Sequence, residues 1–122
     1  MEDKRTILYV DDEEINLMLF EANFRGSYRV LTAESGRQGL RLLEKIPEIT
    51  IVISDMRMPE MNGIEFIKQA KLKYPEIMFY ILTGYDINQE ISSALDVDLI
   101  NAYFRKPFNI DEIANSINAS MN

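Results

Sequence analysis

The chain switches five times between a short apolar segment and a segment with helical periodicity, and this alternation limits the folds open to it. The apolar segments are rich in β-branched and aromatic residues, as strands are. They cover residues 7–10, 28–33, 50–54, 77–82 and 100–104. Each is followed by a helical pattern, the first over about residues 13–24. Strands that alternate with such helices predict βαβ units, a parallel sheet and right-handed crossovers.

The predicted fold class is therefore α/β, a (βα)5 sandwich with helices on both faces of a five-stranded parallel sheet. The leading topology is the flavodoxin-like, doubly wound strand order 2-1-3-4-5. The chain has 122 residues, 47% of them hydrophobic, which suits one core, so we expect a single domain over residues 1–122. The strand order reverses between the first and third strands, and folds of this kind bind ligands in the crevice beyond that point.

Side chains with capping chemistry mark where the helices begin. Ser35, Asn62 and Asn109 each precede a helical pattern and have Gln or Glu three residues later, as in a capping box. Asp86, in Asp-Ile-Asn-Gln, is expected to cap the short fourth helix.

Helical spacing also predicts which side chains face the sheet. In the first helix these are Ile15, Met18, Leu19 and Ala22. In the fifth helix they are Ile110, Ile113, Ala114, Ile117 and Met121.

Polar side chains follow four of the predicted strands. Asp11 and Asp12 follow the first strand, and Asp55 ends the third. Thr83 and Lys106 follow the fourth and fifth strands. Because the carboxyl ends of parallel strands share one edge of the sheet, we expect the three aspartates in one crevice and the other two residues on the same rim.

Three carboxylates in one crevice repel one another, and a divalent cation relieves that repulsion. Oxygen ligands with room for water suit Mg²⁺ better than zinc or copper. The cation would also make one carboxylate a nucleophile toward a phosphoryl group, because it neutralises the phosphoryl oxygens. Lys106 would add positive charge and Thr83 a hydrogen bond. The expected product is an aspartyl phosphate.

The composition removes several other kinds of chemistry. The chain has no histidine and no cysteine, which excludes imidazole bases, thiol nucleophiles and disulfides. Its net charge of −7 argues against nucleic-acid binding by this chain alone, because phosphate contacts need a basic surface. No apolar run approaches the roughly 20 residues of a membrane span, and the charged first residues do not resemble a signal peptide. We therefore expect a cytoplasmic protein without membrane contact.

These residues together resemble the receiver domain of two-component response regulators. The resemblance covers the whole chain and rests on four pieces of sequence that stand in the family's order. They are Asp11-Asp12, the segment Ser54-Asp55-Met-Arg-Met-Pro-Glu-Met-Asn-Gly63, Thr83-Gly84 and Lys106-Pro107-Phe108. The resemblance implies a phosphoprotein of bacterial phosphorelay signalling. Such a module catalyses its own phosphorylation and slow dephosphorylation and is not a turnover enzyme.

The resemblance implies a magnesium-dependent phosphoacceptor site. Asp55 is then the phosphoacceptor and Asp12 a direct Mg²⁺ ligand. Asp11 supports the ion through water or Lys106, and the backbone carbonyl of Arg57 is a further ligand.

The resemblance also implies how the site reports its state. Thr83 would sense the phosphoryl group, Lys106 would pair with it, and the peptide bond between Lys106 and Pro107 would be cis. Tyr103 stands at the position of the family's switch aromatic, and strand alternation puts Phe104 on the opposite face. Arg57 and Tyr85 stand at the two positions that tune dephosphorylation, and their bulk is expected to prolong the phosphorylated state.

The implied phosphoryl donor is a sensor histidine kinase or a histidine phosphotransfer protein. The face of the fourth helix, fifth strand and fifth helix would then change shape to control a partner or effector domain, and the same face offers a surface for a homodimer. The effector is not identified by the sequence, which fits a stand-alone regulator and the receiver of a longer protein equally well.

Plainer explanations exist for each residue alone. Acidic residues such as Asp11 and Asp12 are favoured at a helix N-terminus. Asp55, Thr83 and Lys106 are residue types that are common in ordinary turns and loops, and each stands at a position where the chain is expected to turn. An aromatic residue in a strand, such as Tyr103, is often simply part of the core. Five such coincidences on one rim are needed to explain the whole pattern.

Four other functions are compatible with an α/β fold. An aspartate-nucleophile phosphohydrolase needs a second acid two residues after the nucleophile, where this chain has Arg57. A flavin mononucleotide binder needs a hydroxyl- and glycine-rich loop after the first strand, where this chain has Asp-Asp-Glu-Glu. A nucleotide-binding P-loop motif is absent from the sequence. A degenerate receiver that binds partners without phosphorylation stays open, although every acidic and switch position is filled.

Overall fold

The computed structural model describes residues 4–84 and 88–121, with the backbone alone for the last two of these. The strands are β1 (Thr6–Val10), β2 (Arg29–Ala33), β3 (Ile49–Asp55), β4 (Met78–Thr83) and β5 (Ala102–Arg105). The helices are α1 (Glu14–Phe24), α2 (Gly36–Lys45), α3 (Gly63–Lys73), α4 (Gln89–Asp96) and α5 (Ile110–Met121). Within the described residues, no helix combines the length and apolar composition needed to cross a bilayer.

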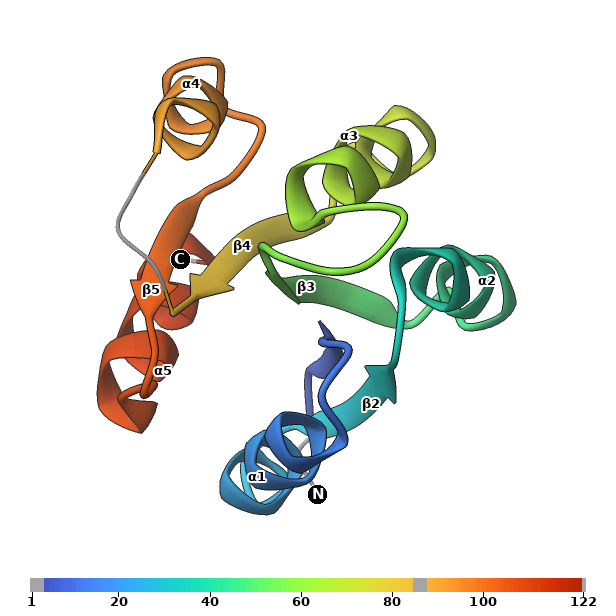
Figure 1. Cartoon of the computed structure of the whole chain (residues 1–122). Coiled ribbons are helices and arrows are strands. Elements are labelled where there is room, and N and C mark those ends of the chain that lie inside the picture. The colour runs from blue at the N-terminus through green and yellow to red at the C-terminus, as the bar shows by residue number, and fades with distance from the viewer. Residues whose placement is uncertain (1–3, 85–87, 122) are drawn as a thin grey trace.

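All the strand pairs are parallel, and the sheet order is β2-β1-β3-β4-β5, which confirms the predicted topology. Helices α1 and α5 cover one face of the sheet, and α2, α3 and α4 cover the other (Figure 1). The middle strands β1, β3 and β4 are buried on both faces. Their continuous apolar runs follow from this position, because a strand covered on both sides has no face for polar residues.

The strand residues divide by alternation into two core layers. Ile7, Tyr9, Ile51 and Ile53 pack under α1 and α5, whereas their neighbours Leu8 and Val52 pack under α2, α3 and α4. The first layer is rich in aromatic rings, and Tyr9, Phe20 and Phe24 form a continuous stack within it. The two layers therefore offer different side chains to the edge of the sheet where the strands end.

The predicted inward face of α1 is wrong. Ile15, Met18 and Leu19 are 68%, 60% and 52% exposed, and Ala22 is also exposed. The buried side chains of this helix are Leu17, Phe20 and Phe24. Both sets have helical spacing, so periodicity could not choose between them. The second set wins because Phe20 stacks on Tyr9 and Phe24 stacks on Phe20, so the two rings bury more apolar area.

In α5 the prediction is correct for Ile113 and Ile117, which are fully buried, and wrong for Ile110, which is 41% exposed. Ile110 is the first residue of the helix. Ala114 is half-buried, and the side chain of Met121 lies outside the described part of the chain.

The helix caps follow the sequence closely. Ser35 caps α2 by accepting the Gln38 N–H, and Asn62 and Glu65 form a complete capping box on α3. Asn109 caps α5 by accepting the Glu112 N–H. For α4 the cap is Asn88, and the predicted cap Asp86 lies outside the described residues.

Candidate functional site: an acidic crevice at the carboxyl edge of the sheet

The candidate site lies where β1 and β3 end side by side. Val10 pairs with Ser54 in the parallel register, so the next residue of each strand, Asp11 and Asp55, enters the same crevice. This is the place where the strand order reverses, as expected for a ligand site in a doubly wound sheet. One carboxylate oxygen from each of Asp11, Asp12 and Asp55 lies within 4.8 Å of the other two. Asp11 is fully buried, Asp55 is 7% exposed, and Asp12 faces solvent.

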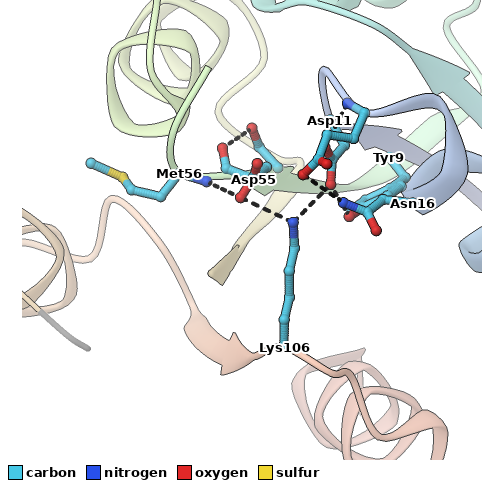
Figure 2. Close-up of polar contacts among 8 residues, drawn as sticks. Tyr9, Asp11, Asn16, Asp55, Met56 and Lys106 are labelled. Atoms are coloured by element: carbon cyan, nitrogen blue, oxygen red, sulfur yellow. Dashed lines mark hydrogen bonds and ion pairs between the residues drawn. The ribbon is translucent and has the colours of Figure 1, made fainter. Parts of the chain in front are cut away.

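Lys106 reaches this crevice from the end of β5, and its ammonium lies between two of the carboxylates (Figure 2). Its Nζ is 2.9 Å from Asp11 Oδ2 and 3.4 Å from Asp55 Oδ1. The Lys106 backbone N–H donates to the Thr83 carbonyl at 2.8 Å, which ties the end of β5 to the end of β4. The Lys106–Pro107 peptide bond is cis. One cation thus offsets the charge of two buried carboxylates, which could not both stay ionised without a partner.

Asp55 is held mainly by backbone groups. Its Oδ1 accepts the Met56 N–H at 2.9 Å, and the Met56 carbonyl accepts the Gly63 N–H at 2.8 Å. The first turn of α3 therefore lies directly against the loop that follows β3. A Cβ on Gly63 would overlap the Asp55 carbonyl oxygen and would lie 2.9 Å from the Ile81 side chain. Only glycine allows the approach of this helix to the aspartate.

Asp11 is held by side chains as well as backbone. Its Oδ1 accepts the Glu13 N–H at 3.0 Å, and its Oδ2 accepts the Tyr9 hydroxyl at 2.6 Å in addition to Lys106. Sequence reasoning did not single out Tyr9. The period of two along a strand contains the signal, because Tyr9 and Asp11 must project from the same face of the chain.

The pKa values of the site follow from burial and from these contacts. Burial first, and then the charge of Asp11, raise the pKa of Asp55 to about 6, although Lys106 and the Met56 N–H oppose the change. Burial alone would lower the pKa of Lys106, but the hydrogen bond to Asp11 and both carboxylate charges leave it raised. Burial, followed by the hydrogen bond to Asp11, raises the pKa of Tyr9, so its hydroxyl remains a donor. The crevice therefore pairs an Asp55 carboxylate that burial makes harder to ionise with a Lys106 ammonium whose charge the carboxylates stabilise.

The donor set fits Mg²⁺. Three carboxylates offer hard oxygen ligands at mutual distances that one small cation can bridge, and the exposure of Asp12 leaves room for water. Burial and then the charge of Asp11 raise the pKa of Asp55, and a bound divalent cation would stabilise its ionised form. Asp11, Asp12 and Asp55 are therefore the residues that would hold the ion.

The other predicted site residues lie around this crevice. Thr83 is buried at the end of β4, one residue beyond the partner of Asp55 in the sheet register. Arg57 is exposed in the loop after β3. Tyr103 is half-buried against the layer of α2, α3 and α4, and Phe104 is buried in the opposite layer, as strand alternation predicts. Tyr85 lies outside the described residues.

A family model described as response regulator receiver domain matches residues 7–118. The chain is 33% identical over 112 residues to sporulation initiation phosphotransferase F of Bacillus subtilis. The aligned region covers 91% of this chain and 89% of that protein. It is 30% identical over 118 residues to the hydrogenase transcriptional regulatory protein HoxA of Cupriavidus necator, but spans only 24% of that protein's length.

Solved structures give the same result. A receiver domain of an HD domain-containing protein from Pseudomonas fluorescens superimposes with a TM-score of 0.88 at 26% identity, covering 97% of this chain and 94% of that one. A response regulator receiver domain protein from Clostridium thermocellum gives a TM-score of 0.83 at 30% identity, covering 96% and 94%. The match thus extends over nearly the whole fold and includes every strand end of the acidic crevice. The chain belongs to the family of response regulator receiver domains.

Proposed function

We propose that this chain accepts a phosphoryl group on Asp55 from a phosphohistidine of a sensor histidine kinase or histidine phosphotransfer protein, in a Mg²⁺-dependent reaction. The observation that carries the proposal is the crevice itself, where Asp55 shares Lys106 with Asp11 and three carboxylates lie within bridging distance of one ion. The pKa of Asp55, about 6, keeps its carboxylate ionised at neutral pH but poorly stabilised, as a nucleophile should be.

The residues of the chain would divide the reaction between them. A carboxylate oxygen of Asp55 attacks phosphorus and forms the new O–P bond. The P–N bond to the donor imidazole breaks, and its electron pair leaves with the imidazole. The Lys106 ammonium, already 3.4 Å from Asp55 Oδ1, pairs with the phosphoryl oxygens. A bound Mg²⁺ would supply further neutralisation of those oxygens.

The response to phosphorylation is proposed to run through Thr83 and Tyr103. The carbonyl of Thr83 accepts the Lys106 N–H, so the ends of β4 and β5 are already linked. A movement of Thr83 toward the phosphoryl group would therefore displace the end of β5, the strand that carries Tyr103. Helix α4 buries only Ile91 and Ala94, so it is a weakly anchored element next to this path. The face of α4, β5 and α5 would then control a partner or effector and offer a homodimer surface.

Two further assignments belong to the same proposal. Arg57 would give its backbone carbonyl to the ion, and Arg57 and Tyr85 would slow the attack of water on the acyl phosphate by their bulk. The module is a signalling domain that acts on itself and turns over no separate substrate. We also propose a cytoplasmic location for the chain, because histidine kinases present their phosphorylated domains there. In this role the chain would contact neither nucleic acid nor membrane.

Intact-mass spectrometry after incubation with a small acyl phosphate tests the assignment of Asp55. We expect one phosphoryl group per wild-type chain with Mg²⁺, and none with a chelator or in the Asp55→Asn variant. Asp111→Asn, the same change on the exposed first turn of α5, is the matched control and should label like wild type.

Stoichiometric labelling of Asp55→Asn would refute the acceptor assignment. If wild type is unlabelled and also fails to bind a beryllofluoride complex that mimics phosphate, the chain is a degenerate receiver that binds its partner constitutively.

A further inference from the structure

The Tyr9 side chain is a part of the crevice that the proposed reaction does not use. It lies on β1 two residues before Asp11, and its hydroxyl donates to Asp11 Oδ2 at 2.6 Å (Figure 2). The residue is 1% exposed. A buried hydroxyl that donates to an ionised carboxylate forms one of the stronger hydrogen bonds available in a protein.

The ring of Tyr9 is fixed by its neighbours. It stacks on Phe20 of α1 with centroids 4.3 Å apart and planes 16° from parallel, and Phe20 stacks on Phe24 at 4.4 Å. Phe108, two residues after Lys106, packs against both phenylalanine rings at 5.7 and 5.8 Å. The hydroxyl is therefore placed by α1 and by the segment that follows Lys106, and it cannot follow Asp11 if that carboxylate turns.

The hydrogen bonds of Asp11 leave little freedom to its carboxylate. Oδ1 accepts the Glu13 N–H, and Oδ2 accepts both Tyr9 and Lys106. A carboxylate has about four acceptor positions, so three are filled. The Tyr9 and Glu13 donors act on different oxygens, and together they define the plane of the carboxylate even when Lys106 moves toward a phosphoryl group.

We propose that Tyr9 is a positioning residue for the metal site, whose hydroxyl holds the Asp11 carboxylate in the orientation that Mg²⁺ requires. The inference rests on the proposed function, because it takes Asp11 as part of the Mg²⁺ site. Tyr9 itself touches neither the ion nor the phosphoryl group. Hydrogen-bond partners of metal ligands act in this way, and their loss typically weakens metal binding by roughly 10–100-fold.

The test is the Mg²⁺ dissociation constant of Tyr9→Phe, measured by titration calorimetry on the unphosphorylated chain. The variant keeps the ring and its stacking but loses the donor, so we expect about tenfold weaker binding. Tyr28→Phe is the matched control, because Tyr28 is buried in the same aromatic cluster, 6.1 Å from Phe24, but lines a cavity with Lys4 and Arg5 far from the crevice. It should bind Mg²⁺ like wild type.

A second measurement needs no metal. The Asp11 carboxyl ¹³C resonance should shift in Tyr9→Phe and stay in place in Tyr28→Phe, because only the first removes a hydrogen bond from that carboxylate. Binding within about twofold of wild type, or an unmoved Asp11 resonance, would overturn the inference and make Tyr9 a packing residue even if the variant is less stable. Failure of the proposed Mg²⁺ site would look different, since wild type itself would then bind no Mg²⁺, and the positioning role would fall with it.

Discussion

Asp11 and Asp55 lie on two sides of the same ammonium group, yet different layers of the protein hold them. Asp11 is fixed from the layer of α1 and α5, through the Tyr9 hydroxyl and the Glu13 N–H. Asp55 is fixed from the layer of α2, α3 and α4, through the Met56 N–H and the close approach of Gly63. Lys106 lies closer to Asp11 than to Asp55, at 2.9 Å against 3.4 Å.

This difference matches two tasks that the proposed metal-dependent phosphoryl transfer would combine. Asp11 has three donors on its two oxygens, which suits a group that keeps one orientation. Asp55 has one backbone donor and a longer contact to Lys106, and its pKa is raised to about 6. A carboxylate that is less well satisfied is the better nucleophile. The fold thus holds Asp11 with more donors than Asp55, as the proposed division into a fixed group and a nucleophile requires.

The largest expected effect comes from the backbone support on the Asp55 side. Gly63→Ala places a methyl group against the Asp55 carbonyl oxygen and the Ile81 side chain, so α3 or the loop after β3 must move. We expect a loss of about 3 kcal/mol in the free energy of unfolding, measured with urea. Gly26→Ala is the control, because within the described residues no atom beyond its own chain neighbours lies within 4 Å of the new methyl group, and its stability should not fall. Equal stability of the two variants would contradict the close approach of α3 to Asp55.

Removal of the Lys106 ammonium should affect Asp11 and Asp55 together, because it contacts both carboxylates. Lys106→Met leaves Asp11 and Asp55 facing each other without the ammonium between them, although Asp55 can relieve the repulsion by taking up a proton. We expect about 2 kcal/mol of destabilisation at neutral pH without metal, less than for a fully buried pair because the Lys106 side chain is 21% exposed.

The same variant should respond more strongly to Mg²⁺. The ion would then take over the role of the lost ammonium between Asp11 and Asp55, so it should restore most of the lost stability. Urea unfolding with and without Mg²⁺ measures this, and Lys68→Met, on the exposed face of α3, is the control that should show neither effect. A Lys106→Met variant as stable as wild type without metal would mean that the ammonium does not offset the two carboxylates.

Replacement of Asp55 should stabilise the protein. The pKa of Asp55 in the folded chain, about 6, is higher than the unfolded value of 3.8, so its favourable contribution is complete below pH 4 and is lost as the pH rises through 6. Asp55→Asn removes the ionised form that is unfavourable above that pH. We expect a gain of about 1–2 kcal/mol at pH 7.5 in metal-free buffer, smaller than the full pKa shift because an amide replaces the protonated carboxyl group only approximately.

The gain should shrink at pH 5, where the folded wild type is already mostly protonated at Asp55. Urea unfolding at both pH values, with chelator present, gives the comparison. A gain that is the same at pH 5 and pH 7.5 would show that ionisation of Asp55 is not its source.

The smallest expected effect concerns the start of α3, which positions Gly63. Asn62→Ala removes the side chain that accepts the Glu65 N–H and half of the capping box, at a cost of about 1 kcal/mol. Asn109→Ala removes the corresponding cap of α5 and should cost a similar amount. Only Asn62→Ala should change the Asp55 backbone amide shifts in NMR spectra. Equal changes from both variants would contradict the role of α3 as the support of Asp55.

Much of the fold and of the site follows from local patterns. The strand order and the caps at Ser35, Asn62 and Asn109 were predictable. The gathering of the aspartates was predictable too, because the carboxyl ends of parallel strands share one edge of the sheet and a crevice forms where the strand order reverses. The face of α1 was not predictable, because Leu17, Phe20 and Phe24 compete with an equally periodic set of apolar residues.

The sequence by itself therefore determined the architecture and the identity of the acidic residues, because both depend on repeats of two and 3.6 residues that the chain carries locally. The tertiary structure decided how those residues are held. The bond from Tyr9 to Asp11 depends on rings brought together from α1 and from the segment after Lys106, and the support of Asp55 depends on how closely α3 approaches β3. Contacts of this kind join distant parts of the chain, and their geometry is fixed only when the whole core is packed.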